Sequence, residues 1–150
     1  MVDVSYLASL IGKSERDDNV VEVLSSLGLP TSLKRPKRGE DEINLVAENY
    51  GIEVAFKTSE SFSQRPDSML EGELILYAVF VRASTDPGNS VSLPFGLTFN
   101  QDRRTVHALL GAPNWSSPML NNDRWLVNET KMLLCFDDDW NSIKEIVFSR

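Results

Sequence analysis

Two segments of the chain carry the hydrophobic spacing of a short amphipathic helix. In residues 12–30 the apolar side chains recur at i, i+3, i+4 and i+7 and therefore share one helical face: Val20, Val23, Leu24 and Leu27. Residues 96–113 carry a shorter stripe of the same kind, made of Val106, Leu109 and Leu110. The pattern predicts one helix in each segment.

The ends of both helices are marked in the sequence. Gly28 and Gly111 stand where a helix end favours a residue without a Cβ, and a proline two residues later prevents continuation. At the start of the first helix, Ser14 precedes Asp17 at the spacing of a capping box, which predicts Ser14 as the N-cap. Asn100 is the predicted N-cap of the second helix.

Strands are predicted by alternation. Residues 52–56 place Ile52, Val54 and Phe56 on one side and the charged Glu53 on the other, which is typical of a half-buried strand. Residues 132–136 repeat the inward spacing, but their outward positions, 133 and 135, are apolar. Residues 74–81 are apolar on both sides. We expect these outward apolar positions to be covered by the other copy's sheet edge, a loop or a partner.

The chain also resembles itself. Three segments match in the same order, with one short indel and a longer loop at 59–72: 12–30 with 96–113, 45–56 with 125–136, and 74–81 with 143–148. We therefore predict an α+β fold of two tandem repeats, each a helical segment packed on a three- to four-stranded antiparallel sheet. The repeats span residues 1–86 and 87–150, with a turn at residues 86–89, and one compact unit is the alternative.

The repeated pattern resembles known families. A glycine, a helix ending in Leu-Leu-Gly-x-Pro, a strand ending in Phe-Asp and a closing Ile-x-x-Ile-x-Phe resemble the helix-plus-sheet unit shared by the β-lactamase inhibitor protein and outer-membrane assembly lipoproteins. The tandem copy, Leu-Ile-Gly-Lys-Ser at 10–14 and the closing segment 142–148 look like pyocin- or colicin-type immunity proteins of bacterial toxin systems. This resemblance implies a tandem-repeat fold and a protein that binds and blocks a toxin.

Composition and charge limit the class of partner that the chain can bind. The chain has 150 residues, of which 41% are hydrophobic, and a formal charge of −7, which argues against nucleic acid or an anionic membrane as partner and favours a basic protein. The first 86 residues hold 15 of the 22 acidic side chains, so steering of a cationic partner would come chiefly from that half. No export signal or apolar span is recognisable, and we expect a cytoplasmic protein.

Catalytic chemistry has little support. The single histidine, His107, is predicted to be a half-exposed helix residue, and the single cysteine, Cys135, a buried thiol without a histidine or second cysteine to activate it. No cofactor or metal site is predicted. The run 137–139 lacks the glycine and glutamate of a calcium loop, so it is a polar hairpin turn, an acidic contact patch or, as a third alternative, a metal site.

A protein-binding surface is the better-supported hypothesis. Trp140 beside the acidic run favours contact, because aromatic side chains are common interface anchors. The basic run at 34–38 is followed at once by acidic residues and reads as a solvated loop. The predicted partner-binding residues are Asp137, Asp138, Asp139, Trp140, Trp115, Glu40, Asp41, Glu42 and Phe62.

The sequence thus predicts a non-catalytic immunity protein that neutralises a cognate, basic bacterial toxin by stoichiometric binding. The alternatives are a cytoplasmic adaptor or secretion chaperone for an effector protein, and a small-molecule-binding domain. A symmetric homodimer through the apolar outer face of the second sheet is also left open.

Overall fold

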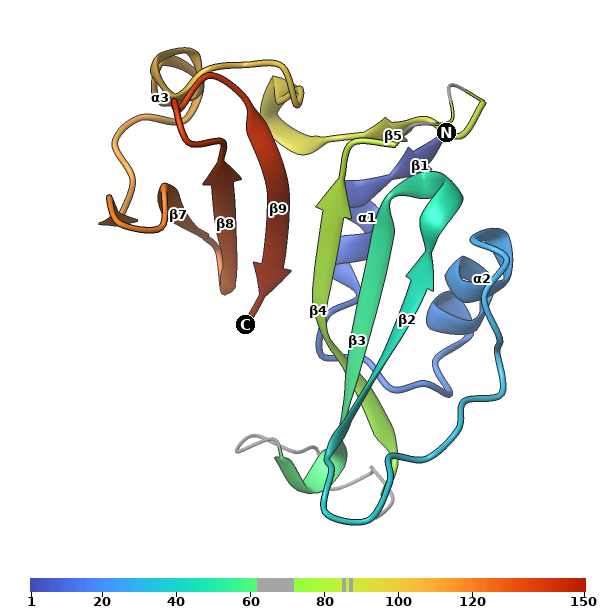
Figure 1. The fold of residues 1–150 in the computed structure, drawn as a ribbon. Coiled ribbons are helices and arrows are strands. Elements are labelled where there is room, and N and C mark those ends of the chain that lie inside the picture. The colour runs from blue at the N-terminus through green and yellow to red at the C-terminus, as the bar shows by residue number, and fades with distance from the viewer. Residues whose placement is uncertain (62–71, 85, 87) are drawn as a thin grey trace.

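The computed structural model describes residues 1–61, 72–84, 86 and 88–150, and the α+β prediction is confirmed (Figure 1). Seven strands form one sheet in the order β2-β3-β4-β9-β8-β7-β6, and every neighbouring pair is antiparallel. The strands are β2 (Glu42–Ala47), β3 (Ile52–Thr58), β4 (Leu74–Arg82), β6 (Trp115–Ser117), β7 (Asn122–Val127), β8 (Thr130–Phe136) and β9 (Ile143–Ser149).

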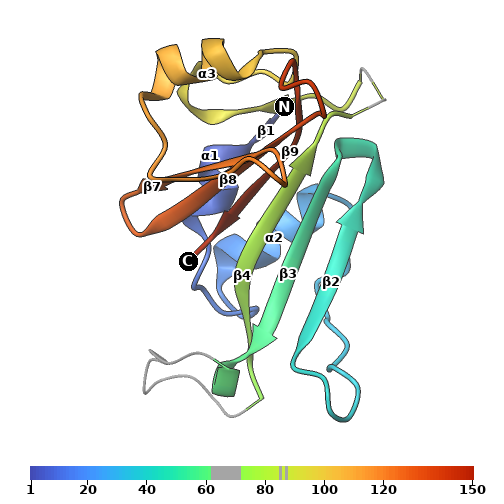
Figure 2. The ribbon, with the colours of Figure 1, turned by 60° about the vertical axis from the view of Figure 1, so that its left-hand side comes forward.

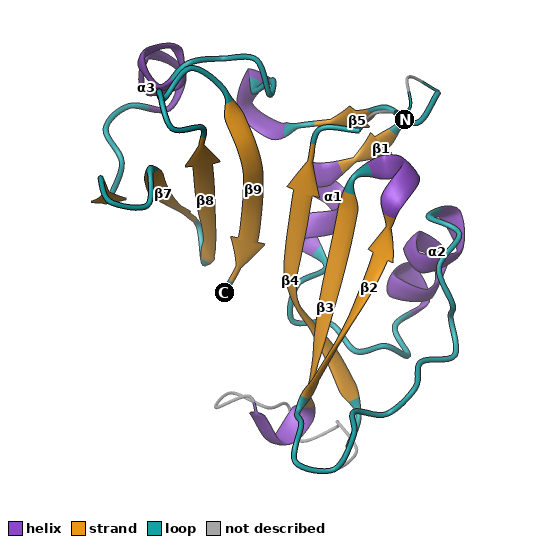
Figure 3. Ribbon diagram, in the orientation of Figure 1, coloured by secondary structure: helices purple, strands orange, loops and turns teal. Residues whose placement is uncertain are grey.

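Helices and a small second sheet complete the fold (Figure 3). The helices are α1 (Val4–Ser9), α2 (Asp18–Ser26) and α3 (Arg103–Leu110), with short 3-10 turns η1 (Glu48–Tyr50), η2 (Ser59–Ser61) and η3 (Pro94–Gly96). A two-stranded parallel sheet pairs β1 (Val2–Asp3) with β5 (Val91–Ser92) and so ties the N-terminal segment to the connection between the two predicted repeats.

All three helices pack on one face of the large sheet. In Figure 2, α1 and α2 lie behind the strands and α3 lies above the ends of β7 and β8. Inward side chains of the strands, such as Phe56 and Leu134, are fully buried in one core with Leu7, Leu24 and Val106 of the three helices. The opposite face carries no helix in the described part of the chain.

Strand β4 has backbone partners on both of its edges. Residues 78–82 pair with β9, and residues 74–76 are bridged on the same edge by the segment that follows α1. There the Gly12 N–H donates to the Leu76 carbonyl at 2.7 Å, and the Leu76 N–H donates to the Lys13 carbonyl at 3.0 Å. The backbone of β4 is therefore paired at both edges, and burial under the helices accounts for the apolar residues on one of its faces.

The start of α2 differs from the predicted capping box. Asp17 is the N-cap, and its carboxylate accepts the backbone N–H of Asn19 at 2.9 Å. Ser14 is instead held at the edge of β4, where its hydroxyl donates to Glu73. Because Ser14 pairs with β4, it is not available to cap α2, and the helix begins after Asp17 instead.

The start of α3 was also predicted two residues early. Asp102 is the N-cap, accepting the Thr105 N–H at 2.8 Å, whereas the Asn100 side chain accepts the Thr98 hydroxyl in the preceding turn. The predicted apolar stripe of α3 is incomplete, since Val106 is buried but Leu109 is 49% exposed. At the helix ends, Gly28 and Gly111 have positive φ values of 72° and 80°, as predicted.

Candidate protein-binding interface

The face of the large sheet that lacks a helix, called here the helix-free face, carries a continuous row of side chains across all seven strands. The strand register aligns one residue from each strand, in the order Trp115, Arg124, Leu133, Val147, Phe80, Glu53 and Val46. Five of these seven are apolar or aromatic. We call these five, Trp115, Leu133, Val147, Phe80 and Val46, the apolar band.

The apolar band is accessible at both ends. Trp115 on β6 is 42% exposed and Val46 on β2 is 49% exposed, while Leu133, Val147 and Phe80 between them are half-buried by their neighbours. The outward apolar positions that the sequence analysis expected to be covered therefore lie, in part, on an open sheet face. An apolar row of this kind is characteristic of protein interaction surfaces.

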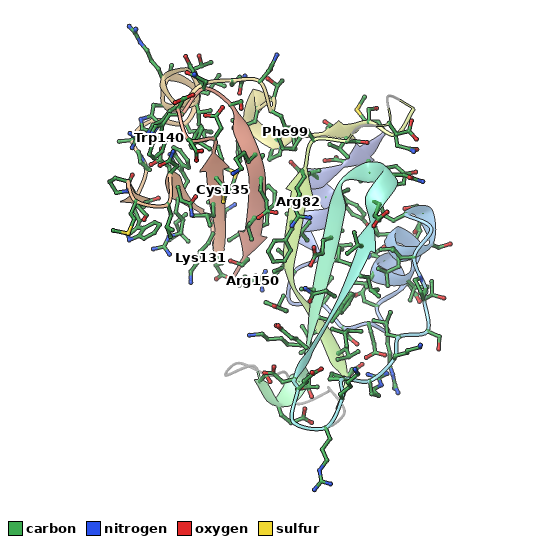
Figure 4. The ribbon with its side chains drawn as sticks, in the orientation of Figure 1. Arg82, Phe99, Lys131, Cys135, Trp140 and Arg150 are labelled. Carbon is green, nitrogen blue, oxygen red and sulfur yellow. The ribbon has the colours of Figure 1, made fainter. Side chains whose placement is uncertain are left out.

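An ion-paired row lies beside the apolar band. Arg82 of β4 reaches Glu145 of β9 at 2.5 Å and Glu53 of β3 at 3.6 Å (Figure 4). Arg82 itself is half exposed. Because one cation is shared between two carboxylates, this row joins strands from both predicted repeats and leaves a net negative charge.

A second polar cluster lies toward the β2 edge. Tyr77 donates its hydroxyl to Glu42 at 2.5 Å, and the Lys57 ammonium lies 4.5 Å from the centre of the Tyr77 ring. Burial, then the hydrogen bond to Glu42 and its negative charge, raise the pKa of Tyr77. The predicted contact residue Glu42 is therefore on the helix-free face and oriented by a neighbour.

The opposite half of the helix-free face carries positive charge. Arg124 packs over Trp115 at 5.1 Å from the ring centre, and Lys131 is exposed at the end of β8 (Figure 4). Cys135 is half-buried on this face beside Glu145, and burial followed by the charge of Glu145 raises the pKa of its thiol. The raised pKa keeps Cys135 protonated and unreactive near neutral pH.

The acidic hairpin between β8 and β9 is largely self-contained. Asp137 accepts the N–H groups of Asp139 and Asn141 and the Ser142 hydroxyl, and these hydrogen bonds, led by that of Asn141, lower its pKa. Trp140 has a positive φ of 61° and packs on Phe136. Two of the predicted contact residues, Asp137 and Trp140, thus stabilise the hairpin, and Asp138 and Asp139 are exposed.

The remaining predicted contact residues are scattered. Glu40 and Asp41 are exposed in the turn before β2, where Asp41 accepts the Ser61 hydroxyl at 2.8 Å. Phe62 lies outside the described residues. Among the described members of the predicted set, Trp115 and Glu42 share the helix-free face, and they stand at its two ends.

A buried carboxylate beneath α3 was missed by the sequence analysis. Asp123 of β7 is fully buried and receives two hydrogen bonds from Arg103, at 2.8 and 3.0 Å, and one from Ser116 at 2.6 Å. Nε2 of His107, the half-exposed helix residue predicted, lies 2.7 Å from the same carboxylate. Burial alone would raise the pKa of Asp123, but the hydrogen bonds from Arg103, Ser116 and His107 lower it below its ordinary value.

The residues around Asp123 connect α3 to the sheet. Ser116 donates its hydroxyl to the carboxylate, and His107 contacts the same carboxylate, so the three side chains do not have the serine–histidine–aspartate order of a catalytic triad. The His107 ring packs edge-on against Trp125 at 5.7 Å, and Arg103 packs over Trp140 at 4.3 Å. Arg103 and His107 are four residues apart and therefore lie on one face of the helix, and Asp123 occupies an inward position of a strand. This pattern in the sequence could have predicted the cluster.

In the described ranges, no three histidine, cysteine, aspartate or glutamate side chains gather as metal ligands. No helix in the same ranges is long and apolar enough to cross a bilayer.

Comparisons with known proteins give one structural likeness. No protein-family model matches this sequence, and a search of curated proteins finds no match. Among solved structures, the chain is similar to an extracellular protein containing a SCP domain from Bacillus anthracis str. Ames, with 12% identity and a TM-score of 0.49. The similarity covers 94% of this chain and 44% of the other, so this chain spans less than half the length of that protein.

Proposed function

We propose that this protein is a non-catalytic immunity protein that neutralises a cognate bacterial toxin by covering it with the helix-free face of its sheet. The observation that carries the proposal is the apolar band, whose five members come from strands aligned in register and which ends in an exposed Trp115 and an exposed Val46. Aromatic and aliphatic anchors surrounded by charged residues are the usual composition of a tight interface.

The proposal includes an origin as two tandem repeats of pyocin-immunity type, 1–86 and 87–150. Strand bounds support it, since β2 (Glu42–Ala47) and β7 (Asn122–Val127) are displaced by the same 80 residues that align the two sequence segments. The last strands of the proposed repeats, β4 and β9, lie side by side at the centre of the sheet. Each helix of the matching pair, α2 and α3, begins with an aspartate N-cap.

The partner is proposed to be a basic protein met in the cytoplasm. A net charge of −7 attracts a cationic toxin at long range and accelerates association. Glu42 at one end of the helix-free face and the exposed Glu40, Asp41, Asp138 and Asp139 near its ends supply acidic groups for the rim of the contact.

The experiment that tests this function is co-expression with the product of the adjoining reading frame, which the proposal expects to be the toxin. We expect a 1:1 complex in native mass spectrometry and loss of toxin activity in the complex. A complex in which the toxin stays active would favour the adaptor or secretion-chaperone function. Free chain or homodimer alone, with the toxin present and unbound, would contradict the proposal.

A further inference from the structure

A hollow on the opposite side of the molecule has the chemistry of a site for a positively charged side chain. It lies between α1, α2 and η1, has a volume of about 400 Å³, and is called here the tyrosine groove. Its lining includes Tyr6 of α1, Tyr50 of η1 and Glu22 of α2, with Leu7 and Val23 between them.

The floor of the tyrosine groove is apolar. Leu7 is 2% exposed, and Val23 and Tyr50 pack against the core, so they form a fixed base. Tyr6 is 44% exposed, which leaves its ring open to a ligand. Aromatic rings and an aliphatic floor suit the methylene stem of arginine or lysine, which buries its carbon chain on apolar surface while its charge stays near water.

The groove carries two carboxylates against one ammonium, that of the Met1 N-terminus, so its net charge is negative. Asp3 and Glu22 line it, and no lysine or arginine side chain does so among the described residues. Asp3 is oriented by its role as N-cap of α1, where it accepts the Tyr6 N–H at 3.3 Å. Two carboxylates and two tyrosine rings around one hollow favour a cation, because carboxylates pair with it and ring faces attract it.

We propose that the tyrosine groove binds an arginine or lysine side chain of the protein partner. This inference rests on the proposed function for the identity of the partner, but the chemistry of the groove is independent of it. A partner that contacts both the helix-free face and the groove on the helical side must wrap around the sheet edge formed by β2, next to which η1 and Tyr50 lie.

The test is a titration of the isotope-labelled full chain by NMR with N-acetyl-arginine methylamide. The matched probe is N-acetyl-citrulline methylamide, which has the same shape without the charge. We expect saturable shifts of the Tyr6, Glu22 and Tyr50 amides with the arginine probe, and affinity lower by about threefold or more with citrulline. Equal affinity for both probes, or no saturable shift at these residues, would overturn the proposal.

Variants locate the site. Glu22→Gln and Tyr6→Leu are expected to weaken arginine binding by a similar factor, whereas Glu129→Gln, an exposed carboxylate on the β7–β8 turn, is expected to leave it unchanged. Unchanged arginine binding by Glu22→Gln and Tyr6→Leu would overturn the site.

The same variants separate this inference from the proposed function. If Glu22→Gln and Tyr6→Leu neutralise the toxin with wild-type affinity, the groove does not serve that partner, and the immunity function stands without it. If the chain fails to neutralise the toxin but still binds arginine through the groove, the proposed immunity function is wrong. The groove would then remain a site for a cationic side chain of another partner.

Discussion

Arg103 donates two hydrogen bonds to Asp123, from Nε at 2.8 Å and from Nη2 at 3.0 Å, and so joins the first residue of α3 to a fully buried carboxylate of β7. His107, one turn along the same helix, lies with Nε2 2.7 Å from Oδ2 of this carboxylate, the oxygen that also accepts from Arg103 Nε. This acidic side chain therefore contacts α3 at two positions one turn apart.

The substitution Asp123→Asn is expected to lower the free energy of unfolding by about 2 kcal/mol, because it removes the charge that Arg103 and His107 contact. Urea denaturation followed by tryptophan fluorescence measures the change. Asp138→Asn, on the exposed tip of the β8–β9 hairpin, is the matched control and should leave the midpoint unchanged. Equal midpoints for both variants would show that the cluster does not anchor α3.

Stability should also depend on pH through Asp123. Its pKa is lowered in the folded protein, so the unfolded chain binds the proton more readily and folding is favoured above the ordinary aspartate pKa of about 3.9. That contribution is lost as the pH falls from about 5 through the lowered folded pKa. We expect the stability difference between wild type and Asp123→Asn to shrink over this range in urea titrations. Parallel curves would contradict the assignment.

Gly51, in the turn between β2 and β3, allows a close backbone approach. Its φ is 70°, and a Cβ there would lie 2.3 Å from the carbonyl oxygen of Arg82. Gly51→Ala should therefore destabilise the fold by about 2 kcal/mol or more, combining backbone strain with displacement of β4. Thermal unfolding measures the loss.

Gly28→Ala is the control for this prediction. Gly28 has nearly the same φ, 72°, but nothing lies within 4 Å of the added Cβ, so only the backbone strain of about 1 kcal/mol is expected. A loss at Gly51 no larger than at Gly28 would show that the contact with Arg82 is unimportant.

Much of the fold could be predicted from the sequence because local signals and packing agree. Ile52, Val54 and Phe56 alternate with Glu53, and the structure buries them together on one face of β3. The glycine ends of α2 and α3 also agree with the prediction. The sequence did not predict α1. This helix has six residues, of which only Val4 and Leu7 are buried, so its hydrophobic periodicity is too short to be recognised.

The interface and the Asp123 cluster could not be predicted in the same way. The apolar band consists of single residues from separate strands, and only the pairing of β4 with β9 aligns Phe80 with Val147. Asp123 and Arg103 are 20 residues apart and meet only after α3 packs on the sheet. Trp140 was predicted as a contact residue because aromatic side chains are common interface anchors, and the structure packs it against Arg103 and Phe136 and leaves it half-buried.

The most direct test of the central claim is the affinity of the Trp115→Ala variant for the toxin, measured by calorimetry beside Phe95→Ala. Trp115 ends the apolar band on the helix-free face, whereas Phe95 is an equally exposed aromatic of η3, with exposures of 42% and 50%. We expect Trp115→Ala to weaken binding by about tenfold or more and Phe95→Ala to change it by less than about twofold. Wild-type affinity for Trp115→Ala, or a larger loss for Phe95→Ala, would contradict recognition through the helix-free face.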